Sequence, residues 1–287
     1  MTAGLVDAHH HVWDLAVRDQ PWLDGPGTAP LRRTFTADDL APAARAAGVR
    51  ATVVVQTVTV PGETGELLAL ADRHPLVGAV VGWIDLTAPD VADRLAALRA
   101  LPGGHRLAGI RHQVQDEPDP DWLLRPAVLR GLAALAAAGL VYDLVVRPPH
   151  LPAATRAAAL LPGLTFVLDH LGKPPVASGA LEPWAGHVRA LAALPNTVCK
   201  LSGLVTEADH ATWTTADLRP YADTVLDAFG PARLMFGSDW PVCLLAARYD
   251  EVVTAARDLT ARLSPAERAA VFADTATRVY GLPAPPA

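Results

Sequence analysis

The sequence is poor in cysteine and has no long uninterrupted apolar run. Its 287 residues include two cysteines, Cys199 and Cys243, which are far apart and match no C-x-x-C motif. We interpret both as buried free thiols in a reducing compartment. The longest apolar stretch, residues 131–146, contains Tyr142 and Asp143. It is better divided into a helix end and a strand than taken as a membrane span.

Blocks of like charge are also absent. The net charge of -6 and the pI near 5.9 do not favour nucleic acid or an anionic membrane as the main partner. The N-terminus lacks the basic segment and apolar core of a secretory signal, so we expect a cytoplasmic protein. Apolar residues make up 51% and charged residues 19% of the chain, which predicts a sizeable core rather than disorder.

Strand-like apolar runs alternate with helix-forming sequence along most of the chain. This pattern is typical of βαβ units with a parallel sheet covered on both faces. Eight units in roughly 240 residues predict one domain over residues 1–287, a closed (β/α)8 TIM barrel. The alternative is a doubly wound open sheet, but no G-x-G-x-x-G follows the first strand. The expected strands are residues 4–6, 49–56, 77–85, 107–113, 140–146, 164–169, 196–201 and 233–236.

Two additions to the barrel are expected. The Pro-, Gly- and Asp-rich segment 12–33 is too long for an ordinary connection and is interpreted as a lid with Trp22 as its anchor. Two helices follow the last strand. The second opens with a capping box at Ser264 and ends near Tyr280, and residues 282–287 are predicted to form a loose tail.

Three consecutive histidines end the first strand. Alternation along a strand places His9 and His11 on one face and His10 on the other. Two imidazoles so close together suit one divalent metal ion, although an H-x-H pattern alone is also compatible with a strand end that binds no ion. The position of the motif and the distant FGSDWP stretch, residues 236–241, favour the metal site.

Active sites of (β/α)8 barrels lie at the carboxyl ends of the strands. Polar or aromatic side chains follow every expected strand, which indicates catalysis if the barrel forms. Besides His9 and His11, they are Gln56, Trp83, Asp85, Arg111, His112, Asp143, Arg147, Asp169, His170, Lys173, Lys200, Ser202, Ser238, Asp239 and Trp240.

Asp239 is the strongest catalytic candidate. In a closed barrel the last strand lies beside the first, so its carboxylate would meet His9 and His11, where it binds a metal, takes a proton from water, or does both. The alternative is a helix N-cap or a core salt bridge. His170 is predicted to orient water, polarise a carbonyl or add a metal ligand; otherwise it is a buried histidine bonded to a backbone carbonyl.

The fourth strand ends with an arginine and a histidine. Arg111 is suited to clamp a carbonyl or carboxylate oxygen, and the alternative is an ion pair with Asp116 or Glu117. His112 is a candidate for substrate binding. Strand alternation allows only one of the two to face the barrel interior unless the chain turns there.

Further side chains are expected to form pocket walls, with barrel packing as the alternative: Gln56, Trp83, Trp22 and Trp240. An aromatic wall suits the apolar face of a sugar ring. Asp143 and Lys200 are interpreted as charges of the barrel interior.

Eight stretches together resemble the amidohydrolase superfamily over nearly the whole chain, and within it the amidohydrolase 2 branch with its sugar-lactone hydrolases. They are VDAHHHVW (6–13), QPWL (20–23), GWIDL (82–86), GIRH (109–112), DHLGKP (169–174), KLSGL (200–204), FGSDWP (236–241) and DTATRVYG (274–281).

The resemblance implies a (β/α)8 barrel that hydrolyses a lactone such as L-fuconolactone or L-rhamnonolactone. His9, His11, His170 and Asp239 would form the site, with Asp239 as general base and then acid. Many members carry a histidine after the fifth strand and a bridging lysine or glutamate on the fourth. This chain has neither, so we expect a single divalent ion, zinc, or the metal-free state that some members of the branch resemble.

Two other functions stay open on the sequence. The same branch resembles metal-dependent decarboxylases, in which Arg111 would hold the substrate carboxylate. A barrel that binds a sugar acid without turnover is the other alternative, although the clustered histidines and aspartate argue against it.

Overall fold

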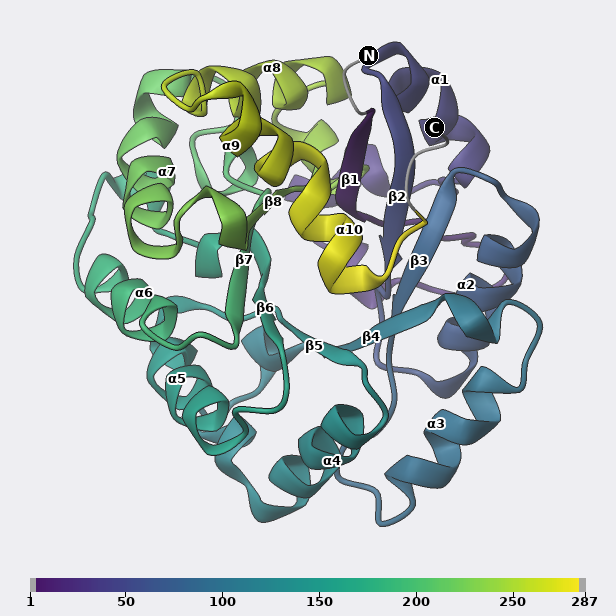
Figure 1. The fold of residues 1–287 in the computed structure, drawn as a ribbon. Coiled ribbons are helices and arrows are strands. Elements are labelled where there is room, and N and C mark those ends of the chain that lie inside the picture. The colour runs from purple at the N-terminus through teal and green to yellow at the C-terminus, as the bar shows by residue number, and fades with distance from the viewer. Residues whose placement is uncertain (1–3, 284–287) are drawn as a thin grey trace.

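Eight parallel strands follow one another in chain order around a nearly closed barrel in the computed structural model, which describes residues 4–283 (Figure 1). The (β/α)8 prediction is confirmed, and the open doubly wound sheet is excluded because each strand pairs with its sequence neighbour. The strands are β1 (Leu5–His10), β2 (Val49–Val55), β3 (Val77–Gly82), β4 (Leu107–His112), β5 (Val141–Leu144), β6 (Phe166–Leu168), β7 (Thr197–Leu201) and β8 (Leu234–Phe236).

The barrel is closed between β1 and the segment that follows β8. The amide of His11 donates to the carbonyl of Trp240 at 2.7 Å, and the amide of Asp239 donates to the carbonyl of His9 at 2.8 Å. These two backbone hydrogen bonds bring residues from opposite ends of the chain to one end of the barrel.

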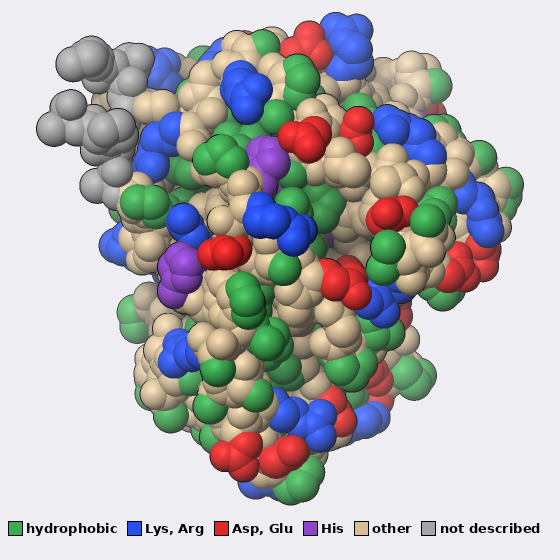
Figure 2. Space-filling model, turned by 90° about the vertical axis from the view of Figure 1, so that its right-hand side faces the viewer, with side chains coloured by type: hydrophobic (Ala, Val, Ile, Leu, Met, Phe, Trp, Pro, Cys, Tyr) green, Lys and Arg blue, Asp and Glu red, His purple; other side chains and the backbone are tan. Residues whose placement is uncertain are grey.

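Helices surround the barrel (Figure 1). Apolar side chains between strands and helices form the larger core, and among the described residues no helix is long and apolar enough to cross a membrane. The helices are α1 (Ala37–Ala46), α2 (Pro61–Arg73), α3 (Val91–Arg99), α4 (Pro126–Ala137), α5 (Leu151–Leu160), α6 (Trp184–Ala192), α7 (Thr215–Phe229), α8 (Tyr249–Leu259), α9 (Pro265–Ala269) and α10 (Thr275–Tyr280). On the face in Figure 2, positive and negative side chains are interspersed.

The C-terminal helix α10 covers the amino end of the barrel, where it crosses the centre of the view in Figure 1. Ala276 and Tyr280 pack there against Val6 and Met235 of the barrel interior. Leu282, which the sequence placed in a loose tail, is instead buried in this cluster because the chain turns back after α10. Residues 284–287 of that predicted tail lie outside the described part of the chain.

The segment after β1 is a folded loop with two short 3₁₀ turns, Pro21–Leu23 and Pro26–Leu31. Its buried anchor is Trp13 rather than Trp22, because Trp13 pairs with Phe35 through the backbone and its indole N–H donates to the carbonyl of Arg33 at 2.7 Å. Trp22 packs edge-on against Trp13 and is 37% exposed.

The contact of helix α10 with the barrel interior leads to the first prediction. The Tyr280 hydroxyl donates to the buried carboxylate of Asp143 on β5 at 2.9 Å. Replacing Tyr280 by Phe removes a hydrogen bond to a charged group, which should lower the free energy of unfolding by about 1.5–3 kcal/mol. Chemical denaturation measures this loss.

The matched control is Tyr221→Phe. The hydroxyl of buried Tyr221 donates to neutral backbone carbonyls, that of Ala180 at 3.1 Å and that of Pro175 at 3.4 Å, so its loss should cost about 1 kcal/mol. Equal losses in the free energy of unfolding would show that the Tyr280–Asp143 hydrogen bond stabilises the fold no more than a hydrogen bond to a backbone carbonyl does.

Candidate active site

An irregularity in β1 turns the histidines into the barrel. Val6 and Ala8 point into the apolar base of the interior, so a regular strand would send His9 outward. The pairing with β2 shifts between Asp7 and His10, as in a β-bulge, and His9 therefore also faces inward.

His9 and His11 meet as the alternation predicts. Their Nε2 atoms lie 3.1 Å apart. Nδ1 of His11 donates to the carbonyl of Val55 at 2.8 Å, so its Nε2 lone pair is directed into the site. His10 is buried on the other face, where burial lowers its pKa to about 3.

Asp239 lies beside these imidazoles. Its Oδ1 is 3.7 Å from Nε2 of His9 and 3.6 Å from Nε2 of His11. The residue has a left-handed backbone with φ of 57°, a conformation that costs an L residue roughly 1–2 kcal/mol and is common at functional sites. Gly237 allows the close approach, since a Cβ there would lie 2.7 Å from the Cβ of His9.

His170 completes the cluster from the end of β6. Its Nε2 lies 3.8 Å from Oδ1 of Asp239, and its Nδ1 lies 2.9 Å from the hydroxyl of Ser202. Burial lowers the pKa of His170 to about 4, so the ring is neutral at pH 7. Gly203 lies against the ring, where a Cβ would come within 2.6 Å of Nδ1.

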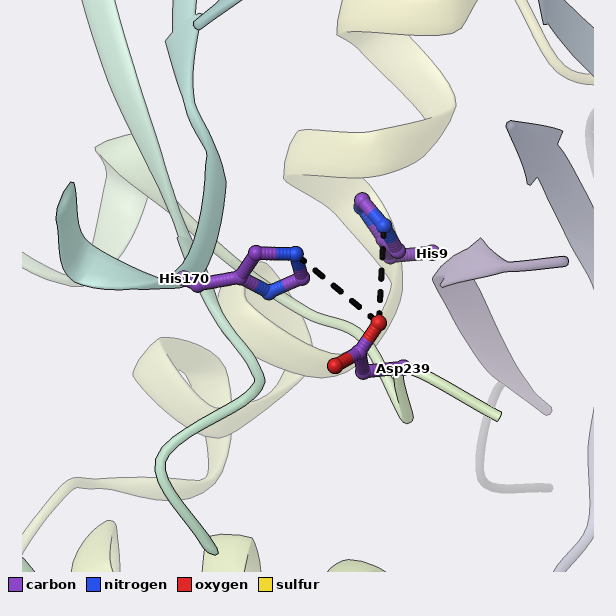
Figure 3. A group of neighbouring side chains, drawn as sticks. All are labelled: His9, His170 and Asp239. Carbon is purple, nitrogen blue, oxygen red and sulfur yellow. Dashed lines mark ion pairs between the residues drawn. The ribbon is translucent and has the colours of Figure 1, made fainter. Parts of the chain in front are cut away.

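His9, His170 and Asp239 converge on one point (Figure 3). One ligand atom from each lies within 4.8 Å of the others. Zinc bonds of 2.0–2.1 Å in a tetrahedral site separate neighbouring ligand atoms by about 3.3 Å. The distances of 3.7 Å and 3.8 Å from Oδ1 of Asp239 to the two imidazoles are close to this spacing, so the donor set fits zinc.

The far nitrogen of His9 has two neighbours that favour opposite tautomers. Asp169 Oδ1 lies 3.5 Å from Nδ1 without a hydrogen bond to it, and its negative charge favours a proton on that nitrogen, which leaves the Nε2 lone pair for an ion. The Lys200 ammonium lies 3.1 Å from the same nitrogen and can only donate to it. Burial and the Lys200 charge both hold the pKa of His9 well below its usual value.

Lys200 is fully buried between two carboxylates beneath the histidines. Its Nζ lies 2.5 Å from Asp143 and 2.9 Å from Asp169. Burial raises the pKa of Asp143 to about 6, even though Lys200 favours its charged form. The prediction that Asp143 and Lys200 are charges of the barrel interior matches this placement.

Arg111 lies in the barrel interior with all its N–H groups directed at protein atoms. Nε and Nη2 donate to the side chain and backbone carbonyl of Gln56, at distances from 2.5 to 3.1 Å. Nη1 donates to Asp169 at 3.0 Å and approaches Nε2 of His9 at 3.4 Å. The predicted partners Asp116 and Glu117 are replaced by Asp169. Four of the five N–H groups of Arg111 thus donate to Gln56 and Asp169, and the fifth faces Nε2 of His9.

A cavity of about 660 Å³ opens above this cluster. Arg111, His11, His170 and Asp239 line it, and Trp22 of the loop after β1 contributes to its wall. His112 also lines it, because the chain turns at the end of β4 and lets Arg111 and His112 contact the same cavity.

Three predicted wall residues do not line this cavity. Gln56 is occupied in holding Arg111, and the indole N–H of Trp83 donates to His112 at 3.0 Å. Trp240 is buried against Phe35 with ring centroids 5.4 Å apart. Strand-end position alone does not distinguish a side chain on the wall from one behind it.

Sequence reasoning missed two members of the site region. Tyr280 contacts Asp143 from the opposite end of the barrel, which no local pattern indicates. Glu117 lines the cavity and accepts from His112 at 2.8 Å. Its position five residues after a strand-end histidine is a usable signal, although the sequence suggests Glu117 only as an alternative partner of Arg111.

Comparison with known proteins agrees with this geometry. The amidohydrolase family model matches residues 6–282. L-Fucono-1,5-lactonases of Burkholderia multivorans and Burkholderia ambifaria are 46% and 40% identical, over 99% and 98% of this chain and 98% and 96% of theirs. A crystal structure of a Burkholderia multivorans amidohydrolase with bound zinc is 45% identical, with a TM-score of 0.91 over 98% of this chain and 100% of that one. The chain therefore belongs to the amidohydrolase family.

Proposed function

We propose that this protein is a zinc-binding lactonase that opens a sugar-acid lactone, L-fucono-1,5-lactone in the first place, by attack of water. The similarity to the two Burkholderia lactonases along nearly the whole chain supports the substrate class. The observation that carries the chemistry is the Asp239 carboxylate, which faces three imidazoles on the floor of an open cavity.

Asp239 is proposed as the group that moves the proton. Burial raises its pKa, but His170 and His11 outweigh burial and hold the pKa below its usual value, so the carboxylate is ionised at neutral pH. Oδ1 makes the contacts to the imidazoles, which leaves Oδ2 for the attacking water. The same oxygen then returns the proton to the ring oxygen that leaves the carbonyl carbon.

His9, His170 and Asp239 are the residues that would hold zinc, with His11 beside them. Bound there, zinc supplies a Lewis acid that polarises the lactone carbonyl and makes water easier to deprotonate. In this proposal Arg111 acts as a positioning residue, since its buried charge holds Asp169 in place beside His9. The exposed indole of Trp22 provides an apolar surface for the sugar ring.

The decarboxylase alternative is disfavoured by the contacts of Arg111, because four of its five N–H groups donate to Gln56 and Asp169 and cannot grip a substrate carboxylate in the paired manner of a free guanidinium. Product analysis separates the three functions. Incubation with L-fucono-1,5-lactone should release acid, followed with a pH indicator, without carbon dioxide. Tight binding of the lactone with no acid at any metal supply would favour a binding protein.

Cytoplasmic location is part of the proposal. Cys199 and Cys243 are both free and buried, which is typical of proteins in a reducing compartment.

The role of Asp239 predicts the effect of an isosteric substitution. Asp239→Asn removes the proton acceptor, so kcat for L-fucono-1,5-lactone should fall by at least about 100-fold. Circular dichroism and thermal unfolding should confirm that the barrel still forms. A variant that keeps kcat within a few fold of the parent would contradict the role of general base.

The metal site predicts the zinc content of the purified protein. The parent should carry zinc that a chelator removes together with activity. His170→Ala removes a ligand and should weaken zinc binding by at least about 10-fold, as measured by metal analysis after dialysis against a zinc buffer.

His210→Ala is the matched control, because His210 is exposed and its side-chain hydrogen bond within residues 4–283 goes to the backbone carbonyl of Thr206. It should retain the zinc content of the parent. Full zinc content in the His170 variant, or full activity of a zinc-free parent, would refute the proposed metal chemistry.

A further inference from the structure

A chain of aromatic side chains supports one wall of the cavity at the end of β4. The ring of His112 stacks on Trp122, with centroids 4.2 Å apart and an angle of 4° between the planes. The indole N–H of Trp83 donates to Nδ1 of His112 at 3.0 Å. Nε2 of His112 lies 2.8 Å from Oε1 of Glu117. These contacts fix the histidine ring in position and in orientation.

The contacts also determine which nitrogen of His112 carries the proton. An indole N–H can only donate, so Nδ1 of His112 must accept. The proton of the neutral ring is therefore on Nε2, from which it is donated to Glu117. Both ring nitrogens are used in this way, and His112 has none left to bind a substrate. His112 is therefore not expected to bind the substrate directly, as predicted from the sequence, but to hold a neighbouring carboxylate that does.

Glu117 is that group. It lines the cavity that Asp239 and His170 also line, and its side chain is 23% exposed. Within residues 4–283, its contacts include one side-chain hydrogen bond, the one from His112 to Oε1. Oε2 takes no part in that bond. Like any oxygen of an ionised carboxylate, it can accept hydrogen bonds but not donate them. The carboxylate is thus held by one oxygen while the other is available at the cavity wall.

We propose that Glu117 recognises the ring hydroxyls of the lactone, with Trp83 and His112 as the residues that position its carboxylate. The inference rests on the proposed lactonase function and deepens it. A sugar lactone is neutral and carries several hydroxyl donors, for which a carboxylate is the strongest acceptor in a protein. A lactone without hydroxyls cannot form this hydrogen bond, so Glu117 favours the sugar lactone over it.

The experiment compares two six-membered lactones, L-fucono-1,5-lactone and the unsubstituted δ-valerolactone. Glu117→Gln keeps the size of the side chain and removes its charge. We expect kcat/KM for the sugar lactone to fall about 10- to 100-fold, mainly through KM, because a hydrogen bond to a charged group is lost. For δ-valerolactone, kcat/KM should change by less than about 2-fold, because it donates no hydrogen bond.

Asp116→Asn is the matched control for charge. Asp116 is the adjacent carboxylate, it is exposed and also lines the cavity, and it is not held by His112. Its substitution should leave the ratio of kcat/KM for the two lactones unchanged. An equal shift of that ratio in both variants would mean that general charge, and not Glu117, sets the preference.

Two further substitutions test the positioning residues. His112→Phe keeps the stack on Trp122 and removes both hydrogen bonds, so it should shift the ratio in the same direction as Glu117→Gln. His112→Gln retains a donor for Glu117 and should restore part of the preference. A merely structural role of His112 predicts loss of stability or of activity on both lactones alike, with no change in their ratio.

The outcomes separate this inference from the function on which it rests. A parent protein that hydrolyses neither lactone overturns the proposed lactonase function, and this inference with it. A parent that hydrolyses the sugar lactone, with a Glu117→Gln variant that retains the parent's ratio, overturns the role of Glu117 alone.

Discussion

The backbone junction between β1 and the segment after β8 is the constraint on which the site depends. Two hydrogen bonds, from His11 to Trp240 and from Asp239 to His9, join the ends of the chain where the barrel closes. The carboxylate and the imidazoles are therefore positioned by main-chain pairing, and sites held by strands are more precise than sites on loops. Gly237 is part of the same junction, because a larger residue would push the chain away from His9. Geometry at the floor of the cavity thus follows from barrel closure itself.

Beneath that floor lies a buried network in which charges of opposite sign balance. Lys200 and Arg111 contribute two positive charges, and Asp143 and Asp169 supply the carboxylates that face them. Such groups are costly to bury and stay charged only when paired and hydrogen-bonded. Tyr280 donates to Asp143 from the helix that covers the amino end of the barrel, so the network connects the C-terminal segment to the histidines. The apolar base of the barrel and the polar site above it are joined through this network.

The wall of the cavity is built differently from its floor. Floor residues come from strand ends and are held by the barrel, whereas Trp22 and Glu117 lie in loops after β1 and β4. Loops vary more easily than strands, so they are the natural place for substrate selection on a conserved type of scaffold. Glu117 gains the rigidity that a loop lacks through His112, which is stacked on Trp122 and bonded to Trp83. The catalytic groups thus lie at the strand ends, and the groups that select the substrate lie in the loops.

The sequence by itself determined the barrel, the placement of His9 and His11 on one face of β1, and the meeting of both with Asp239. Each follows from periodicity and chain order, which are local properties or consequences of closing eight strands. Only the tertiary structure decided the rest: the bulge that turns His9 inward, the hydrogen bonds of Arg111 to Gln56 and Asp169, the burial of Trp240 and Leu282, and the contact of Tyr280 with Asp143. These depend on distances between residues far apart in the chain. Strand alternation and motif spacing carry no information about such distances, because they describe neighbours along the backbone and not neighbours in space.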